Sequence, residues 1–419
     1  MAVTSTPPTV PDDGGTPPET APAPAVDTSA GSADSDATVR PWQRPSTWIG
    51  AAALVAWTAL LVALTWPDSG LSWHFFPAGA RALFGSSGLH LYADNPGYQI
   101  GPLTFVVARA LLLLGDANAV VAAKLLMTAA GPLCIAVLLP VIPPSMRGRR
   151  VWFAAFAVMP GWVVLSVRWA HLDDVLATVL LVLVLRSVLR GRAVWAGALL
   201  ALAAASKPWA VDAAPLLLGL DRRAWKNALA ALAAGLALTW GPFLVAAPGT
   251  LQAMTPSVLM APGSGLWALG VRDHIVPAWD RTVAFVAAIG IATVAQLRGR
   301  WAGVIVVALA VRIALDPQDN AYYLGSLVVA AAVYDLLGTR NRLPWLTLVT
   351  TAVFWQPFTQ DYANRLTTTS GWSHWWFANL DTVGYLHLAW CVAVVVLVLA
   401  GPVPPAAPPV VRDRERQAE

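Results

Sequence analysis

The most compact group of reactive residues in this chain is His171-Leu172-Asp173-Asp174, which lies between two long apolar runs. Ionisable residues at membrane depth are costly and usually functional. An imidazole and two carboxylates within four residues can hold a polar ligand or an ion. The same two acids would also favour the start of a helix, through capping and the helix dipole. These two interpretations are compatible, and the sequence leaves both open.

Two isolated cations also lie in apolar surroundings. Lys207 stands at a Lys-Pro break and needs an anionic partner, which is either a lipid-linked phosphate or one of Asp173 and Asp212. Arg312 lies within an apolar run and either meets a phosphate or pairs with Asp316, four residues further on. Each cation therefore has a functional and a purely structural interpretation.

A further group follows the first apolar run and contains Asp68, His74 and Asp94. A carboxylate or a neutral imidazole near a membrane surface can take the proton from an acceptor hydroxyl group. The alternative is that these residues belong to a solvated loop. The group as a whole indicates chemistry more strongly than any one of its members.

The elements that position these residues must be membrane helices. Of the 419 residues 57% are apolar and 12% are charged, whereas a soluble domain carries about 25% charged residues. The basic residues, which give a net charge of +4, are scattered in short loops and form no nucleic-acid-binding stripe. Cys134 and Cys391 lie in apolar runs and are expected to be small core residues. Neither a metal nor a cofactor is predicted.

The apolar runs predict an all-α, polytopic transmembrane bundle of about 10–12 spans. Residues 46–403 form this domain, between disordered cytoplasmic tails at 1–45 and 404–419. The expected helices are Trp48–Trp66, Ala119–Leu139, Val151–Ala170, Val175–Arg190, Ala193–Ser206, Trp209–Leu220, Asn227–Ala246, Thr282–Leu297, Trp301–Leu315, Tyr322–Leu337, Leu343–Trp355 and Val383–Val403.

The distribution of charge predicts the orientation of the bundle. Most Lys and Arg residues fall in alternate loops, which the positive-inside rule places in the cytoplasm together with both termini. The acids gather in the other loops, chiefly Pro67–Asn118, Pro248–Arg281 and Gln356–Asp381. The first of these extracytoplasmic loops is large and carries two expected surface helices, Phe76–Phe84 and Pro102–Leu114. The reactive face is therefore predicted to be extracytoplasmic.

The sequence contains none of the motifs that bind nucleotides in soluble enzymes, such as G-x-x-x-x-G-K-[ST] or G-x-G-x-x-G, and no H-E-x-x-H. An outward-facing enzyme without a nucleotide site needs an activated donor that is already outside. A sugar carried on polyprenyl phosphate meets that condition.

The order of one apolar helix, a large loop with two surface helices and many further spans resembles the GT-C superfamily of integral-membrane glycosyltransferases, in particular the bacterial polyprenyl-phosphate-mannose-dependent mannosyltransferases. The resemblance includes Phe75-Phe76-Pro77-Ala78-Gly79-Ala80, Leu91-Tyr92, Gly101-Pro102-Leu103, His171-Leu172-Asp173-Asp174 and Lys207-Pro208-Trp209. It implies inverting transfer of a sugar, with mannose favoured, to a lipid or glycan acceptor of the cell envelope.

The resemblance also implies an acidic base in the first outer loop. At that place this chain reads Ser72-Trp73-His74, so the expected base is His74, Asp94 or Asp68. Lys207 and Arg312 would then steady the departing lipid phosphate, and the His171–Asp174 turn would bind substrate. The competing hypothesis is a multi-span transporter or flippase for a lipid-linked or polar solute. The large outer loops and the lack of a second copy of the motifs favour the enzyme.

Overall fold

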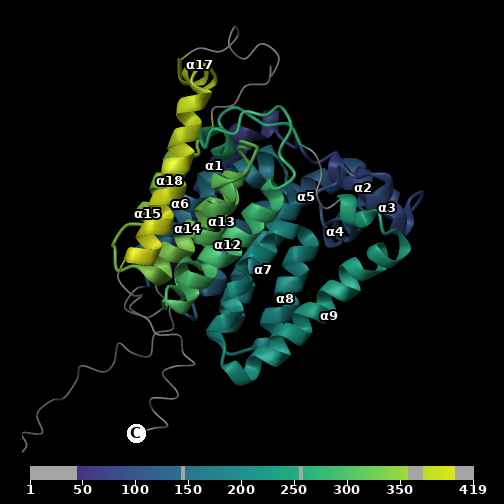
Figure 1. The fold of residues 1–419 in the computed structure, drawn as a ribbon. Coiled ribbons are helices and arrows are strands. Elements are labelled where there is room, and N and C mark those ends of the chain that lie inside the picture. Colours follow the sequence, from purple (N-terminus) through teal and green to yellow (C-terminus); the bar gives the residue numbers. More distant parts are fainter. Residues whose placement is uncertain (1–44, 143–146, 254–257, 357–370, 402–419) are drawn as a thin grey trace, which may run out of the picture. The chain divides into compact units, whose positions relative to one another are not determined.

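The computed structural model describes residues 45–142, 147–253, 258–356 and 371–401 (Figure 1). Helices make up 76% of the structure, and the described residues contain no strand, which confirms the predicted all-α class. The chain divides into two units, residues 1–49 and 50–419, and all contacts reported below lie in the second. The predicted tails lie outside the described residues apart from Pro45.

Six helices are long and apolar enough to cross a membrane, which indicates a multi-pass membrane protein. The buried share is only 6% of the span in α1 (Pro45–Thr65) and 17% of the span in α9 (Arg222–Ala246), as expected of apolar helices that face lipid. The six are α1 (Pro45–Thr65), α5 (Asp116–Leu138), α6 with the π-helical turn that follows it (Arg149–Val163 and Val164–Arg168), α9 (Arg222–Ala246), α12 (Asp280–Leu297) and α18 (Leu380–Ala400).

This number is smaller than the 10–12 spans predicted, because the other predicted spans form shorter or more polar helices. Every residue of α14 after Tyr323 is buried. A helix that is enclosed by protein need not match the thickness of a bilayer, since its neighbours replace lipid. The shorter or more polar helices are α7 (Leu172–Leu189), α8 (Ala193–Ser206), the 3-10 helix η6 (Pro208–Gly219), α13 (Val304–Ala314), α14 (Tyr323–Gly338) and α15 (Trp345–Val353).

The segment between α1 and α5 contains the two helices that the sequence predicts there. They are α2 (Phe75–Leu83) and α4 (Pro102–Leu112), with the single turn α3 (Leu91–Asp94) between them. The two helices pack closely where Gly79 meets Phe105, because a Cβ atom on Gly79 would lie only 2.1 Å from Phe105 Cε1. The segment is therefore a folded unit and not an open loop.

The three segments that the sequence predicts to be extracytoplasmic are called outer segments, and the one between α1 and α5 is the first. The other two contain only short helices among their described residues. They are α10 (Thr250–Ala253), α11 (Gly265–Ala268) and α17 (Gly371–Ala378). Leu259 and Ile275 form one isolated antiparallel bridge between the two halves of the second outer segment. Cys134 and Cys391 are buried and free, which confirms their prediction as core residues.

Candidate functional site

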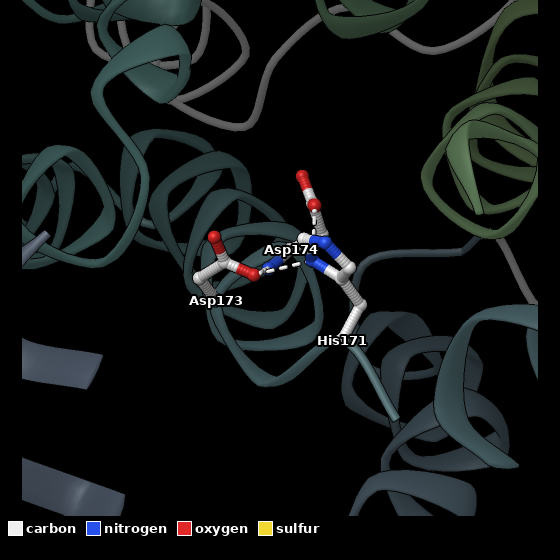
Figure 2. Close-up of side chains that lie close together, drawn as sticks. All are labelled: His171, Asp173 and Asp174. Atoms are coloured by element: carbon white, nitrogen blue, oxygen red, sulfur yellow. Dashed lines mark hydrogen bonds and ion pairs between the residues drawn. The ribbon is translucent and has the colours of Figure 1, made fainter. Parts of the chain in front are cut away.

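His171, Asp173 and Asp174 converge at the start of α7 (Figure 2), where Lys207 joins them; these four residues are called the His171 cluster. His171 Nδ1 lies 2.5 Å from Asp173 Oδ1 and 2.8 Å from Asp174 Oδ2. Lys207 Nζ lies 2.5 Å from Asp173 Oδ2 and 3.5 Å from Asp174 Oδ2. The predicted motif residues thus form one buried ion-pair network.

The local backbone explains why these side chains meet. The helix α6 ends in the π-helical turn Val164–Arg168, and the His171 N–H donates to Leu165 O at 3.1 Å. Ala170 has a φ of +49°, which is uncommon for a residue other than glycine and costs energy. Asp173 Oδ1 also accepts the Asp174 backbone N–H at 2.9 Å, which satisfies one of the free N–H groups of the first helical turn. The ligand-binding interpretation of the motif stays a prediction.

Lys207 reaches the cluster from a break between two helices. Its backbone is extended, with φ −144° and ψ 120°, between the end of α8 and the start of η6. The next turn supplies Trp209, whose indole N–H donates to Asp174 Oδ1 at 2.9 Å. Of the partners that the sequence offers to Lys207, the structure selects Asp173, with Asp174 as a second. Burial without such partners would be very costly for an ammonium group.

The first outer segment binds to the turn that carries His171. The backbone N–H of Gly70 donates to Arg168 O at 2.8 Å, and that of Ser72 donates to Trp169 O at 2.9 Å. The ring of Phe76 meets the His171 ring edge-on at 5.8 Å, while Tyr322 stacks on the imidazole at 3.9 Å and 20°. The imidazole is therefore held between the first outer segment and the start of α14.

The same segment also binds to the break that carries Lys207. The Gly101 N–H donates to Ser206 O at 2.8 Å, and Thr104 Oγ1 donates to the same carbonyl at 3.1 Å. A Cβ atom on Gly101 would lie 2.0 Å from Ala205 O, so only glycine fits. The first outer segment thus adjoins both halves of the His171 cluster, as the sequence interpretation requires.

His74 and Asp94, two of the three candidate bases of the first outer segment, are not part of the ion-pair network. His74 is exposed, and its ring lies 4.0 Å from that of Phe75. Asp94 is exposed at the end of α3. Neither side chain has a hydrogen bond or an ion pair with any residue in the described ranges. Asp68 ends the short turn Trp66–Asp68, and its side chain lies outside the described part of the chain.

Arg312, near the end of α13, has the partner four residues further on that the sequence offers. Its guanidinium lies 3.9 Å from Asp316 Oδ2, and its side chain remains 22% exposed. Asp316 also accepts from the Tyr323 hydroxyl at 3.3 Å. The Tyr323 ring in turn contacts the ring of Tyr322, which stacks on His171, with centroids 4.9 Å apart. The Arg312–Asp316 pair therefore lies near the His171 cluster, but the described residues form no ion pair between the two.

The geometry of His171 defines its protonation. Two carboxylates accept at Nδ1, so the neutral ring carries its proton there and leaves the lone pair on Nε2. Burial would lower the pKa of His171, but the negative charge of Asp173 and the hydrogen bonds to both carboxylates outweigh burial and the charge of Lys207, and the pKa is raised. Nε2 has no hydrogen-bond partner in the described ranges, which suits a general base.

The carboxylates and imidazole are also close enough to be considered as metal ligands. One ligand atom from each of His171, Asp173 and Asp174 lies within 4.8 Å of the others. The Lys207 ammonium, however, already supplies a positive charge at 2.5 Å from Asp173. A metal ion would have to displace that ammonium, so these carboxylates fit the Lys207 side chain better than a metal ion.

The sequence interpretation did not predict two of the residues that the structure singles out. Tyr322 is predicted only as the first residue of an apolar helix, yet it stacks on His171. His387, in the middle of the apolar run of α18, was not considered, although a lone histidine in such a run is a signal in itself. Comparisons with protein-family models, curated proteins and solved structures found no match.

Proposed function

We propose that this protein is a membrane glycosyltransferase of the GT-C type. It transfers a sugar, with mannose favoured, from a polyprenyl-phosphate donor to a lipid or glycan acceptor on the extracytoplasmic face, with inversion at the anomeric carbon. The multi-pass helical structure and the packed segment between α1 and α5 support this proposal. The contact of that segment with the turn that carries the carboxylate-paired His171 imidazole, at the start of α7, supports it as well.

The observation that carries the proposal is the pairing of His171 with Asp173 beside the first outer segment. A carboxylate that holds an imidazole at Nδ1 orients Nε2 to accept a proton and stabilises the imidazolium that results. We therefore assign the role of base to His171, ahead of His74, Asp94 and Asp68. The last three remain candidates for contact with the acceptor.

In the proposed step the acceptor hydroxyl gives its proton to His171 Nε2 while its oxygen bonds to the anomeric carbon. The bond between that carbon and the phosphate oxygen breaks, and polyprenyl phosphate leaves with the electron pair. Before the step the His171 cluster holds two carboxylates and one ammonium, and the transferred proton brings it to neutrality. Asp173 and Asp174 thus stabilise the charge that His171 acquires.

Lys207 and Arg312 are proposed to steady the leaving phosphate. Both retain some access to solvent, with exposed side-chain fractions of 13% and 22%. Each is paired with carboxylates, so its charge is balanced in the absence of substrate. Binding of the phosphate would then proceed by sharing these cations between the carboxylates and the donor.

The experiment uses full-length protein in lipid nanodiscs with polyprenyl-phosphate [¹⁴C]mannose and a membrane extract as acceptor. We expect transfer by the wild type and loss of transfer in His171→Ala. His74→Ala and Asp94→Ala are matched controls, because both side chains are exposed; we expect folded proteins that keep a larger share of activity. The proposal is wrong if the wild type transfers neither mannose nor another sugar, such as arabinose, from a polyprenyl-phosphate donor.

A transporter or flippase is the second candidate, and one observation favours it. The helix that Lys207 interrupts continues as the buried 3-10 helix η6, and interrupted helices next to a charge are frequent in transporters. Reconstituted vesicles distinguish the two functions. Movement of labelled polyprenyl-phosphate sugar across the bilayer without transfer to an acceptor supports the transporter and contradicts the enzyme.

A further inference from the structure

A second histidine and aspartate meet away from the proposed catalytic residues. Asp319, in the segment between α13 and α14, His387 of α18 and Trp376 of α17 form what is called the Asp319 cluster. His387 Nδ1 lies 3.5 Å from Asp319 Oδ1 and 3.3 Å from Gly263 O. The Trp376 ring lies 5.8 Å from the His387 ring. Three separate segments of the chain thus place one carboxylate, one imidazole and one indole together.

Each of these three side chains keeps one buried polar atom without a hydrogen-bond partner in the described part of the chain. The atoms are Asp319 Oδ2, His387 Nε2 and Trp376 Nε1. His387 is 3% exposed and Trp376 is 2% exposed. An unsatisfied buried polar group is costly, and native structures contain few of them. Three of them on neighbouring side chains indicate that a group outside the described residues satisfies them.

The chemistry of these atoms defines what fits. Nδ1 of His387 faces two acceptors and therefore carries the proton of the neutral ring, so Nε2 accepts. The cluster then offers two acceptors, on Asp319 and His387, and one donor, on Trp376. A hydroxyl group has one hydrogen to donate, so two hydroxyl groups, as adjacent carbons of a sugar carry them, can donate to the two acceptors, and either oxygen can accept from the indole N–H. An anion would be repelled by the Asp319 carboxylate, and one carboxylate with one imidazole is too few ligands for a structural metal ion.

Aromatic rings surround the cluster. Phe354 lies parallel to His387, with ring centroids 4.3 Å apart and an angle of 6°. Trp372 and Trp375 stack on each other at 4.9 Å, and Trp372 meets Trp376 at 5.5 Å. Both outer rings are exposed, by 49% and 38%. Flat apolar faces next to hydroxyl-binding atoms match a sugar ring, which has C–H faces and a rim of hydroxyl groups.

We propose that the Asp319 cluster is a binding site for a neutral saccharide, separate from the His171 cluster. Asp319 lies three positions before Tyr322, which stacks on His171, so the two clusters share one connecting segment. The proposal concerns binding and does not depend on glycosyl transfer. If the proposed function also holds, this site would take the acceptor glycan.

The test measures binding of mannotriose to full-length protein in nanodiscs by isothermal titration calorimetry. We expect saturable binding by the wild type. Trp376→Phe keeps an aromatic ring but replaces the indole and so removes its N–H, and Asp319→Asn keeps the shape but removes the charge. We expect each to weaken binding roughly five- to tenfold. Trp195→Phe is the control, because Trp195 is 61% exposed on α8, and its affinity should equal that of the wild type.

Two further measurements identify the kind of saccharide bound and separate this proposal from the proposed function. In the first, octyl α-mannoside represents a glycolipid head group and mannotriose a free glycan, and the probe that binds more tightly shows which of the two the site takes. His171→Ala should bind both probes as the wild type does, even if it transfers no sugar. No binding of either probe by the wild type, or equal affinity in Trp376→Phe, Asp319→Asn and the control, would overturn the proposal. Thermal unfolding identifies a variant that fails to fold, and the other variant then decides.

Discussion

The His171 and Asp319 clusters each pair an imidazole with a carboxylate but differ in how closely the two groups are paired. In the first, an imidazole lies 2.5 Å from one carboxylate, and a lysine lies at the same distance from the other oxygen of that carboxylate. In the second, the imidazole and carboxylate are 3.5 Å apart, and three buried polar atoms lack partners in the described ranges. Internal pairing fixes a geometry, as a base requires, whereas missing partners leave room for a ligand.

The largest expected effect concerns the His171 imidazole. His171→Ala removes the proposed base while Asp173 and Asp174 keep Lys207 as their partner. We expect transfer of sugar from polyprenyl phosphate to fall by about 10²–10⁴-fold, the usual contribution of a general base. Transfer of labelled mannose in nanodiscs measures this. Activity within a few-fold of the wild type would show that His171 is not the base.

The second effect concerns stability. Lys207→Ala leaves two buried carboxylates without their cation, and we expect a loss of about 3–5 kcal/mol in the free energy of unfolding. Arg81→Ala is the matched control, because its pair with Asp116 is exposed, by 54% and 73%, and exposed pairs contribute about 0–1 kcal/mol. Denaturant unfolding in detergent compares the two variants. Equal losses would contradict the charge-balanced description of the His171 cluster.

A smaller effect tests the contact between the first outer segment and the Lys207 break. Gly101→Ala forces a methyl group against Ala205 O, and overpacking of this kind costs about 1–3 kcal/mol. We expect reduced stability and reduced sugar transfer. Gly97→Ala is the control, because a Cβ atom at Gly97 meets nothing within 4 Å. If Gly101→Ala behaves as Gly97→Ala does, the segment does not depend on this contact.

The smallest effect is expected at the Asp319 cluster without sugar. Asp319→Asn removes a buried charge whose second oxygen has no partner in the described residues, so the free energy of unfolding should change by less than about 1 kcal/mol in either direction. Denaturant unfolding of the ligand-free protein measures this change. A loss as large as that of Lys207→Ala would show that Asp319 is a structural ion-pair residue and not a ligand-binding one.

Much of the His171 cluster could be predicted from sequence because its members are close in the chain or stand out in apolar runs. His171, Asp173 and Asp174 lie on one turn. Lys207 follows a helix that contains no acidic residue. Which carboxylate Lys207 selects could not be predicted, because the choice depends on how α8 packs against α7 (Figure 1). The stacking of Tyr322 on His171 is equally a matter of tertiary packing.

The helices themselves were predictable to within a few residues, since apolar periodicity marks them directly. Ala193–Ser206 is found as α8 with the same ends, and Pro102–Leu114 ends two residues earlier than predicted. Six of the 10–12 predicted spans are helices long and apolar enough to cross a membrane by themselves, and hydropathy does not distinguish a helix buried in protein from one in lipid. The burial of α14 shows that difference.

The most direct test of the central claim is the pH dependence of sugar transfer. His171 must be neutral to accept a proton, so the rate should fall as pH falls through the pKa of His171, which lies above its usual value of 6.5. The charge of Asp173 raises that pKa, so Asp173→Asn should move the midpoint of this fall to lower pH. We predict this shift in a variant that thermal unfolding shows to be folded. The same midpoint in the wild type and Asp173→Asn would contradict a base formed by His171 and Asp173.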